Sequence, residues 1–219
     1  MCNRFRLTAN QASIMRAAGL EPPYPDDEWY PPPREIFPTG GKTPRFGLTI
    51  RRSAEGNRGL LFTAMEWGFP TQIPSKRDPK VKLTKYVTNA RNLDSSFWRP
   101  SLASPERRCL VPFTHFAEPH PERGTGDDGL PRQMWFSLPD QPVGMFAGLW
   151  RETERGPAFA FVTTEPNDLI RPTHEKAMPA ILPPAAQSPW LDGTAEEARA
   201  LIKPYKGPMA QQIATPPLE

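Results

Sequence analysis

"RFGLTIRRSAEGNRGLLFTAMEWGF", residues 45–69, carries the clearest strand signal in this chain. Two of its runs, 45–52 and 59–69, are rich in aliphatic, aromatic and β-branched residues, and the turn-forming segment SAEGN at 53–57 separates them. Strand-forming runs joined by a short, turn-rich connection are typical of a β-hairpin. The stretch therefore predicts two paired antiparallel strands.

Runs of the same kind extend this prediction to a larger sheet. They are RCLVPFTHF at 108–116, QMWFSL at 133–138, GMFAGLW at 144–150, AFAFVTT at 158–164 and AMPAIL at 177–182. A stretch rich in glycine and charge, 119–131, is expected to be a loop. Many short strands with few helices indicate an α+β fold. We expect one domain over residues 1–219, built around a curved or barrel-like, mostly antiparallel sheet.

Two short helices are expected at the edges of this sheet. The first is predicted within 8–20, where Thr8 or Asn10 can cap the first turn. The second is predicted at 194–202, because Thr194 with a glutamate three residues later has the spacing of a capping box.

Proline is abundant, with 30 residues among 219, yet proline and glycine together stay below the level typical of disordered chains. The proline-rich segment 21–44 has enough aromatic and aliphatic residues, such as Trp29 and Ile36, to wrap a core. We expect wrapping rather than a linker between domains.

The formal charge of +3 permits an anionic partner without requiring one. Basic residues cluster at 51–52, 75–85, 97–99 and 107–108, and each cluster taken alone is as readily explained by a solvated face. No hydrophobic signal segment precedes the fold and no apolar run nears the roughly 20 residues that span a membrane. These features predict a cytoplasmic monomer with no membrane contact and no cofactor.

Two cysteines, Cys2 and Cys109, are too few for a disulfide framework. Cys109 lies in an apolar, strand-like run and is expected to be buried and inert. His115 and His120 flank Glu118, but no further ligand spacing completes a zinc set, so no metal site is expected.

Cys2 offers unusual chemistry because removal of Met1 would leave an amine and a thiol on the same carbon. An α-amine has a reference pKa near 8, so part of it is neutral near neutral pH and can attack an aldehyde. The neighbouring sulfur can then close a thiazolidine ring. Two other roles stay open for Cys2: a nucleophile that attacks an amide with its own amine as base, and an ordinary residue at the start of a strand.

Seven segments, in the same order, make the chain resemble the SRAP proteins (SOS response-associated peptidase), which cap abasic sites in single-stranded DNA. The segments are MCNRF at 1–5, MEWGFP at 65–70, NAR at 89–91, RRCLVPFTHFAEP at 107–119, FAGLW at 146–150, FAFVTTEPN at 159–167 and HEKAMPAIL at 174–182. The sequence also departs from the family pattern. Asn3 stands where glycine is common, the acidic residue that the family commonly has after NAR is missing, and Lys176 replaces an arginine.

The resemblance implies roles for individual residues. Cys2 would link covalently to the ring-opened deoxyribose, and Asn89 would hold the sugar and the amine. Glu118 and His174 would lie at the reacting centre. Arg91, Arg4, Thr163 and Lys176 would contact the DNA backbone.

The chemistry of these side chains suggests what several of them would do in the reaction. A carboxyl group such as Glu118 can shuttle protons during imine formation if burial raises its pKa. His174 can protonate the sugar ring oxygen. Trp67 and Phe69 would stack on bases if they are exposed, and Arg99 belongs to a basic cluster that would also bind DNA.

The sequence thus predicts a protein that recognises abasic sites in single-stranded DNA and cross-links to them through Cys2, shielding the lesion. When bound to DNA it would lie on the nucleoid. Lyase activity by β-elimination and peptidase activity are further possibilities. The alternatives from other classes are a hydrolase with an N-terminal cysteine nucleophile and a non-covalent module that binds single-stranded DNA.

Overall fold

The structure is a computed structural model, and it describes residues 2–22, 29–40, 43–53 and 59–218. The predicted turn at 53–57 lies almost wholly outside the described residues, as does part of the proline-rich segment.

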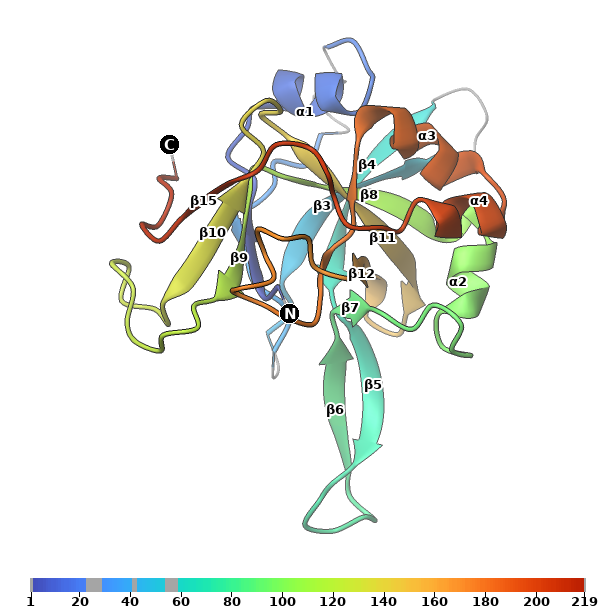
Figure 1. The fold of residues 1–219 in the computed structure, drawn as a ribbon. Helices are drawn as coiled ribbons and strands as arrows, with labels where there is room; N and C mark the ends of the chain where they lie inside the picture. Colours follow the sequence, from blue (N-terminus) through green and yellow to red (C-terminus); the bar gives the residue numbers. More distant parts are fainter. Residues whose placement is uncertain (1, 23–28, 41–42, 54–58, 219) are drawn as a thin grey trace.

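Five strands close into a barrel (Figure 1). They are β3 (Phe46–Arg52), β4 (Leu60–Trp67), β8 (Arg108–Phe113), β11 (Gly144–Thr153) and β12 (Gly156–Thr164). Their order is β12-β4-β3-β8-β11, and pairing of β11 with β12 closes the ring. All of these pairs are antiparallel except β12 with β4. The predicted α+β fold with a barrel-like, mostly antiparallel sheet is confirmed, and so is the pairing of β3 with β4.

A second sheet packs against the barrel, in the order β15-β10-β9-β1-β2. Its strands are β1 (Arg4–Arg6), β2 (Glu35–Ile36), β9 (His115–Pro119), β10 (Gln133–Ser137) and β15 (Ala210–Gln212). The run at 108–116 was predicted as one strand, and that is wrong: it divides at Thr114 between the two sheets. The backbone N–H of Thr114 donates to the Arg6 carbonyl, so the chain leaves the barrel there and enters the second sheet.

Short strands extend the sheet of the barrel at β11 and β12. β7 (Asn89–Ala90) and β13 (Met178–Pro179) both pair with β12, and β14 (Ile181–Leu182) pairs with β11.

A two-stranded arm projects from the barrel and belongs to neither sheet (Figure 1). It consists of β5 (Phe69–Pro74) and β6 (Lys82–Val87). The chain leaves β4 for the arm at Gly68, whose φ of 124° is open to glycine but strained for other residues. The arm was not predicted, because its prolines interrupt the alternation that marks a strand.

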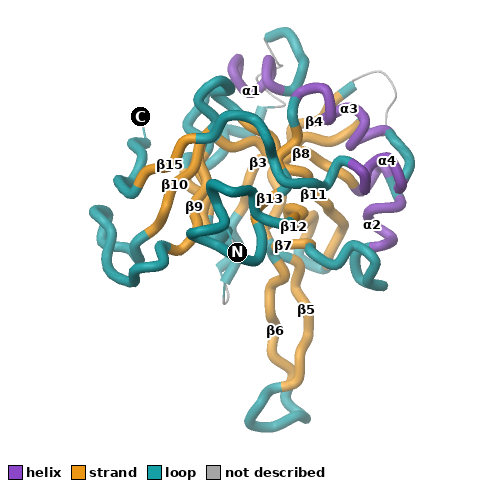
Figure 2. The backbone as a smooth tube through the Cα atoms, viewed as in Figure 1, coloured by secondary structure: helices purple, strands orange, loops and turns teal. Residues whose placement is uncertain are grey.

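Helices lie at the periphery, at a distance from the arm (Figure 2). They are α1 (Gln11–Ala17), α2 (Arg99–Ala103), α3 (Pro184–Asp192) and α4 (Ala195–Ala200), with a 3-10 turn, η2, at Pro105–Arg107. The side chain of Asn10 caps α1, and Thr194 with Glu197 forms the predicted capping box of α4. α2 and α3 were not predicted, and α3 even contains Pro189.

Aromatic rings fill the space between the barrel and the second sheet. Phe5 on β1 makes edge contacts with Trp67 and Phe161 of the barrel, at ring-centroid distances of 5.2 and 5.9 Å. This packing matters for the site because it fixes the start of the chain against the barrel.

Candidate functional site

Cys2 lies against Glu118 because of the register between two strands. β1 pairs antiparallel with β9, with Arg4 opposite Ala117, so the residues just before β1 run along the end of β9. The Cys2 side chain is 1% exposed and its Sγ donates to the Arg4 carbonyl at 3.5 Å. The backbone of Cys2 hydrogen-bonds the Glu118 carboxylate. The predicted nucleophile and the predicted proton shuttle are therefore neighbours.

Burial sets the protonation of both groups. Burial raises the pKa of Glu118 to about 7, although the positive charge at the start of the chain and the hydrogen bond from Cys2 partly oppose the rise. Burial, and then the negative charge of Glu118, raise the pKa of the Cys2 thiol above its usual range. The sulfur is thus a neutral thiol near pH 7, while the carboxyl group exchanges its proton in that range.

Asn89 is placed by β7, which pairs with β12 with Asn89 opposite Phe161. Its Nδ2 donates to Thr88 Oγ1 at 2.8 Å. Its Oδ1 is buried and, among the described residues, has no hydrogen-bond partner. Leaving a buried acceptor unsatisfied is costly, so this oxygen is suited to a ligand's donor.

His174 sits in the turn before β13, on the same side of the barrel as Asn89. Its Nδ1 lies 2.7 Å from the Ala177 carbonyl oxygen and 3.1 Å from the Ala177 nitrogen. The shorter contact favours a proton on Nδ1, which leaves Nε2 to exchange a proton. Burial lowers the pKa of His174, and the positive charges of the chain start, Arg91 and Lys176 lower it further. At neutral pH the imidazole is therefore uncharged.

The same positive charge, that of the chain's amino group, lowers the pKa of both Glu118 and His174. Figure 2 shows the beginning of the chain in the same part of the molecule as β7, β9 and β13. The fold thus places Cys2 against Glu118, and the hydrogen bond from Arg91 to the Lys176 carbonyl joins the segments that carry Asn89 and His174.

Two of the residues predicted to contact the backbone of DNA lie on the rim of this site. Arg91 Nη2 donates to the Lys176 carbonyl at 2.6 Å, which ties the segment after β7 to the turn before β13. The side chains of both Arg91 and Lys176 are exposed. Thr163 lies beside them on β12 but is 4% exposed, with its hydroxyl donating to the Ala90 carbonyl at 3.5 Å.

Arg4 was predicted to contact the DNA backbone, and the structure contradicts a direct contact. The residue is 3% exposed, and its Nη2 lies 2.8 Å from Glu35 Oε1 and 2.5 Å from Asp128 Oδ2. Its guanidinium also stacks over Trp135, 4.9 Å from the ring centroid. The ion pairs of Arg4 thus connect β1 with β2 and with the loop after β9.

Trp67 and Phe69 were predicted to stack on bases, and this prediction is wrong because both are fully buried. Trp67 packs on Phe5 and donates from Nε1 to the Thr88 carbonyl at 3.0 Å. Phe69 packs edge-on against Trp98 at 5.2 Å. Both are core residues that support the segment leading to Asn89.

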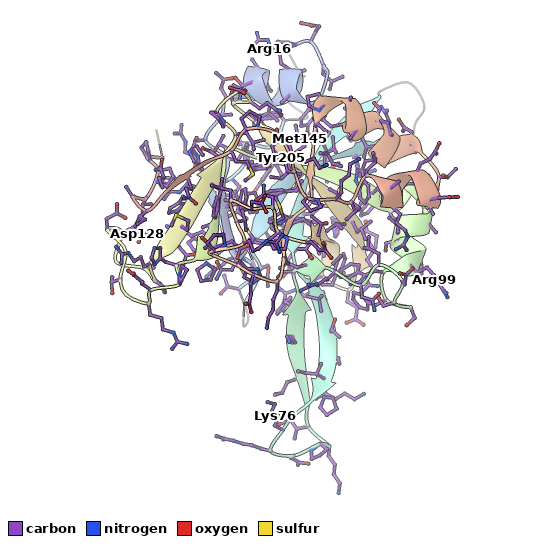
Figure 3. The ribbon with its side chains drawn as sticks, in the orientation of Figure 1. Arg16, Lys76, Arg99, Asp128, Met145 and Tyr205 are labelled. Atoms are coloured by element: carbon purple, nitrogen blue, oxygen red, sulfur yellow. The ribbon has the colours of Figure 1, made fainter. Side chains whose placement is uncertain are left out.

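Arg99 is exposed on α2 at the edge of the molecule (Figure 3), whereas Arg91, Thr163 and Lys176 lie on or beside β7, β12 and β13. The structure therefore does not bring it together with the other predicted DNA-binding residues.

Sequence reasoning missed the residues that position the site. Thr88 holds both Asn89 and Trp67, Ala177 holds His174, and Glu35 with Asp128 neutralises Arg4. No local pattern marks these residues, because each acts on a partner that the fold supplies.

Within the part of the chain that the structure describes, no group of three or more His, Cys, Asp or Glu side chains could hold a metal ion. None of the described helices has the length and apolarity to cross a membrane.

The fold and the site define a small α+β barrel protein with a buried cysteine near the start of its chain, a carboxyl group of raised pKa beside it, and an imidazole in the turn before β13. Over residues 1–216 the sequence matches the family model described as SOS response associated peptidase (SRAP), so the chain belongs to this family. Membership supports a role associated with DNA damage and the SOS response.

Solved structures share the fold. A crystal structure of a protein from Bordetella bronchiseptica has a TM-score of 0.70 at 21% sequence identity, covering 98% of this chain and 100% of that one. A crystal structure of a protein from Bacteroides thetaiotaomicron has a TM-score of 0.66 at 19% identity, covering 97% of this chain and 91% of that one. No curated protein matches the sequence.

Proposed function

We propose that this protein recognises abasic sites in single-stranded DNA and forms a covalent thiazolidine cross-link to them through Cys2, once Met1 has been removed. One observation carries the proposal: the buried thiol at the start of the chain lies against a carboxyl group whose pKa of about 7 suits proton transfer. The cross-link would shield the lesion from strand cleavage.

The chemistry balances without a cofactor. The neutral amine of Cys2 adds to the C1′ aldehyde of the ring-opened sugar, and Glu118 carries one proton from the attacking nitrogen to the alkoxide oxygen, which gives a carbinolamine. Glu118 then carries the second proton from the nitrogen to the departing hydroxyl, which leaves as water and gives an imine. The sulfur attacks the imine carbon, and the thiol proton passes to the nitrogen. Aldehyde plus aminothiol thus become a thiazolidine and one water.

The other site residues fit supporting roles. Asn89 Oδ1, a buried acceptor, would take a hydrogen bond from the amine or from a sugar hydroxyl. Nε2 of His174 would take the proton of the C1′ hydroxyl and pass it to the sugar ring oxygen, which opens the ring to the aldehyde. Arg91 and Lys176, exposed on the rim, would contact phosphates.

The raised pKa of the Cys2 thiol argues against peptidase activity. Cysteine nucleophiles that attack amides act as thiolates and lie in surroundings that lower the thiol pKa. Here burial and a neighbouring carboxylate raise the pKa of Cys2, so the amine is the better first nucleophile. An imine at C1′ also acidifies the neighbouring carbon, so β-elimination is a side reaction that closure of the thiazolidine suppresses.

With DNA as its substrate, the protein is proposed to act as a monomer in the cytoplasm, on the nucleoid when bound to DNA.

A denaturing gel tests the proposal. Purified protein is mixed with an oligonucleotide that carries one abasic site, and the mass of the protein is measured first to establish that Met1 is absent. We expect an adduct that survives heat and detergent in wild type and in Cys109→Ala, but not in Cys2→Ala or with undamaged DNA. An adduct that persists in Cys2→Ala, or no adduct with processed wild-type protein, would contradict the cross-link.

A further inference from the structure

The arm formed by β5 and β6 is the part of the molecule that the proposed reaction leaves unexplained. It stands clear of both sheets, and Lys76 marks its far end (Figure 3). Isolated two-stranded ribbons are only marginally stable in water, so an arm of this kind calls for a partner that orders it.

The arm is strongly basic. Residues 70–87 contain five cations and one acid, Asp78. The cations are Lys76, Arg77, Lys80, Lys82 and Lys85, and all five are exposed. This charge favours a polyanion and opposes pairing with the same arm of a second copy of the chain.

The cations lie on both faces of the ribbon. β6 pairs with β5 so that Lys82 is opposite Pro74 and Lys85 is opposite Thr71. Because side chains alternate between faces along a strand, two residues three apart, such as Lys82 and Lys85, point to opposite faces. One DNA strand running along one face would contact only one of these two lysines.

We infer that the arm binds duplex DNA next to the single-stranded lesion, by lying in the major groove with phosphates on both sides. This deepens the proposed function and rests on it for the position of the lesion. The major groove, about 12 Å wide, admits a two-stranded ribbon, and its two walls are phosphate backbones. A ribbon that enters the groove edge-first turns one face toward each wall, so Lys82 and Lys85 can reach phosphates on opposite walls.

The position of the arm agrees with this assignment. β6 ends at Val87 and β7 begins at Asn89, so a single residue, Thr88, separates the arm from the site. Each strand has six residues, so the arm reaches roughly 20 Å from the barrel at the usual rise per residue. DNA that enters the site therefore passes the base of the arm.

Exposed apolar side chains add a second kind of contact. Ile73 and Leu83 face each other across the arm and are 37% and 49% exposed. In the major groove, aliphatic side chains can contact thymine methyl groups, whereas phosphate contacts alone would not require them.

The test compares two triple variants with equal loss of charge in the Cys2→Ala background, which removes the cross-link from the measurement. The first, Lys76→Gln/Arg77→Gln/Lys80→Gln, neutralises the tip of the arm. The control, Arg16→Gln/Lys203→Gln/Lys206→Gln, neutralises exposed cations elsewhere on the chain. The probes are a blunt 20-base-pair duplex and one of its strands alone, each measured by fluorescence anisotropy at several salt concentrations.

We expect the tip variant to bind the duplex about tenfold more weakly at low salt, with the slope of log affinity against log salt reduced by about 2 to 3. The control should stay within about twofold of the parent. Equal losses in both variants, or a loss confined to the single strand, would overturn the inference.

Single variants on the two faces sharpen the test. Lys82→Gln and Lys85→Gln should each weaken duplex binding by a similar factor of about two to three, whereas an effect of only one would contradict binding within a groove. With Cys2 present, the tip variant should cross-link to a short abasic single strand at the wild-type rate. Failure of the proposed function would instead remove the adduct from every variant and leave duplex affinity unchanged.

Discussion

The pocket around Cys2 and the projecting arm use polar groups in opposite ways. In the pocket, Cys2 and Glu118 are buried, and their environment shifts their pKa values. On the arm, all five cations are exposed, and we propose that they bind DNA together. Low-dielectric surroundings make each buried group individually important, while solvent screens each exposed charge. We therefore expect single substitutions in the pocket to have large effects, and substitutions on the arm to have small, additive, salt-dependent effects.

The largest effect is expected from Cys2→Ser, which keeps the amine but removes the sulfur. The imine can still form, yet no thiazolidine can close, so the heat-stable adduct should fall at least 100-fold. Borohydride should restore an adduct by reducing the imine, and strand cleavage by β-elimination should increase. A denaturing gel with and without borohydride measures all three. A stable Cys2→Ser adduct without reductant would show that the sulfur is not required.

Glu118→Gln should slow formation of the adduct about 100-fold, because positioned proton transfer contributes on the order of 10² to 10⁴ in rate. Since the pKa of Glu118 is about 7, the ratio of wild-type to variant rate should rise with pH through 7 and level off above it. Both proteins share the ionisation of the amine, so the ratio isolates the carboxyl group. Glu122→Gln, an exposed carboxyl group three residues after β9 ends, is the matched control and should react as wild type does.

The same substitution should stabilise the fold at high pH. The pKa of Glu118 is raised in the folded state, so the folded protein holds an extra proton between about 4.5 and 7, and wild type loses stability as pH rises through this range. The Glu118→Gln variant does not lose this stability, because glutamine does not ionise. Glu118→Gln should match wild type near pH 4.5 and exceed it by about 3 kcal/mol above pH 7. Urea titrations at both pH values measure this; a difference independent of pH would contradict the raised pKa.

Much of the fold followed from local patterns, because each pattern reports on its own neighbourhood. The hairpin of β3 and β4, the cap of α1 at Asn10 and the capping box of α4 all depend on residues close in sequence. The switch between sheets at Thr114 could not be predicted, since the apolar run continues unbroken across it. The arm was hidden for the opposite reason: its prolines and lysines suggest a loop.

For the site, the chemical types of the residues could be predicted from the sequence, but the exposure of their side chains could not. Cys2, Asn89, Glu118 and His174 could be named from the resemblance, and the structure places Cys2 against Glu118. Trp67, Phe69 and Arg4 have side chains equally suited to DNA contact and to a core, and only long-range packing distinguishes the two. Asn3 shows a simpler case: its side chain is exposed, so replacing glycine there does not crowd the buried thiol beside it.

The smallest effect is expected from Lys176→Gln, and it tests where the pocket ends. Lys176 is exposed like the arm cations, yet its carbonyl binds Arg91 and its charge lowers the pKa of His174. If the side chain only contacts a phosphate, affinity for single-stranded DNA should fall about twofold to threefold and the salt slope by about 1. Lys203→Gln, an exposed lysine on another surface, is the control. A loss of affinity that disappears at high salt would show that Lys176 acts as an exposed phosphate contact, as the arm cations do. A loss of cross-linking rate that persists at high salt and saturating DNA would instead make it part of the pocket, acting through His174.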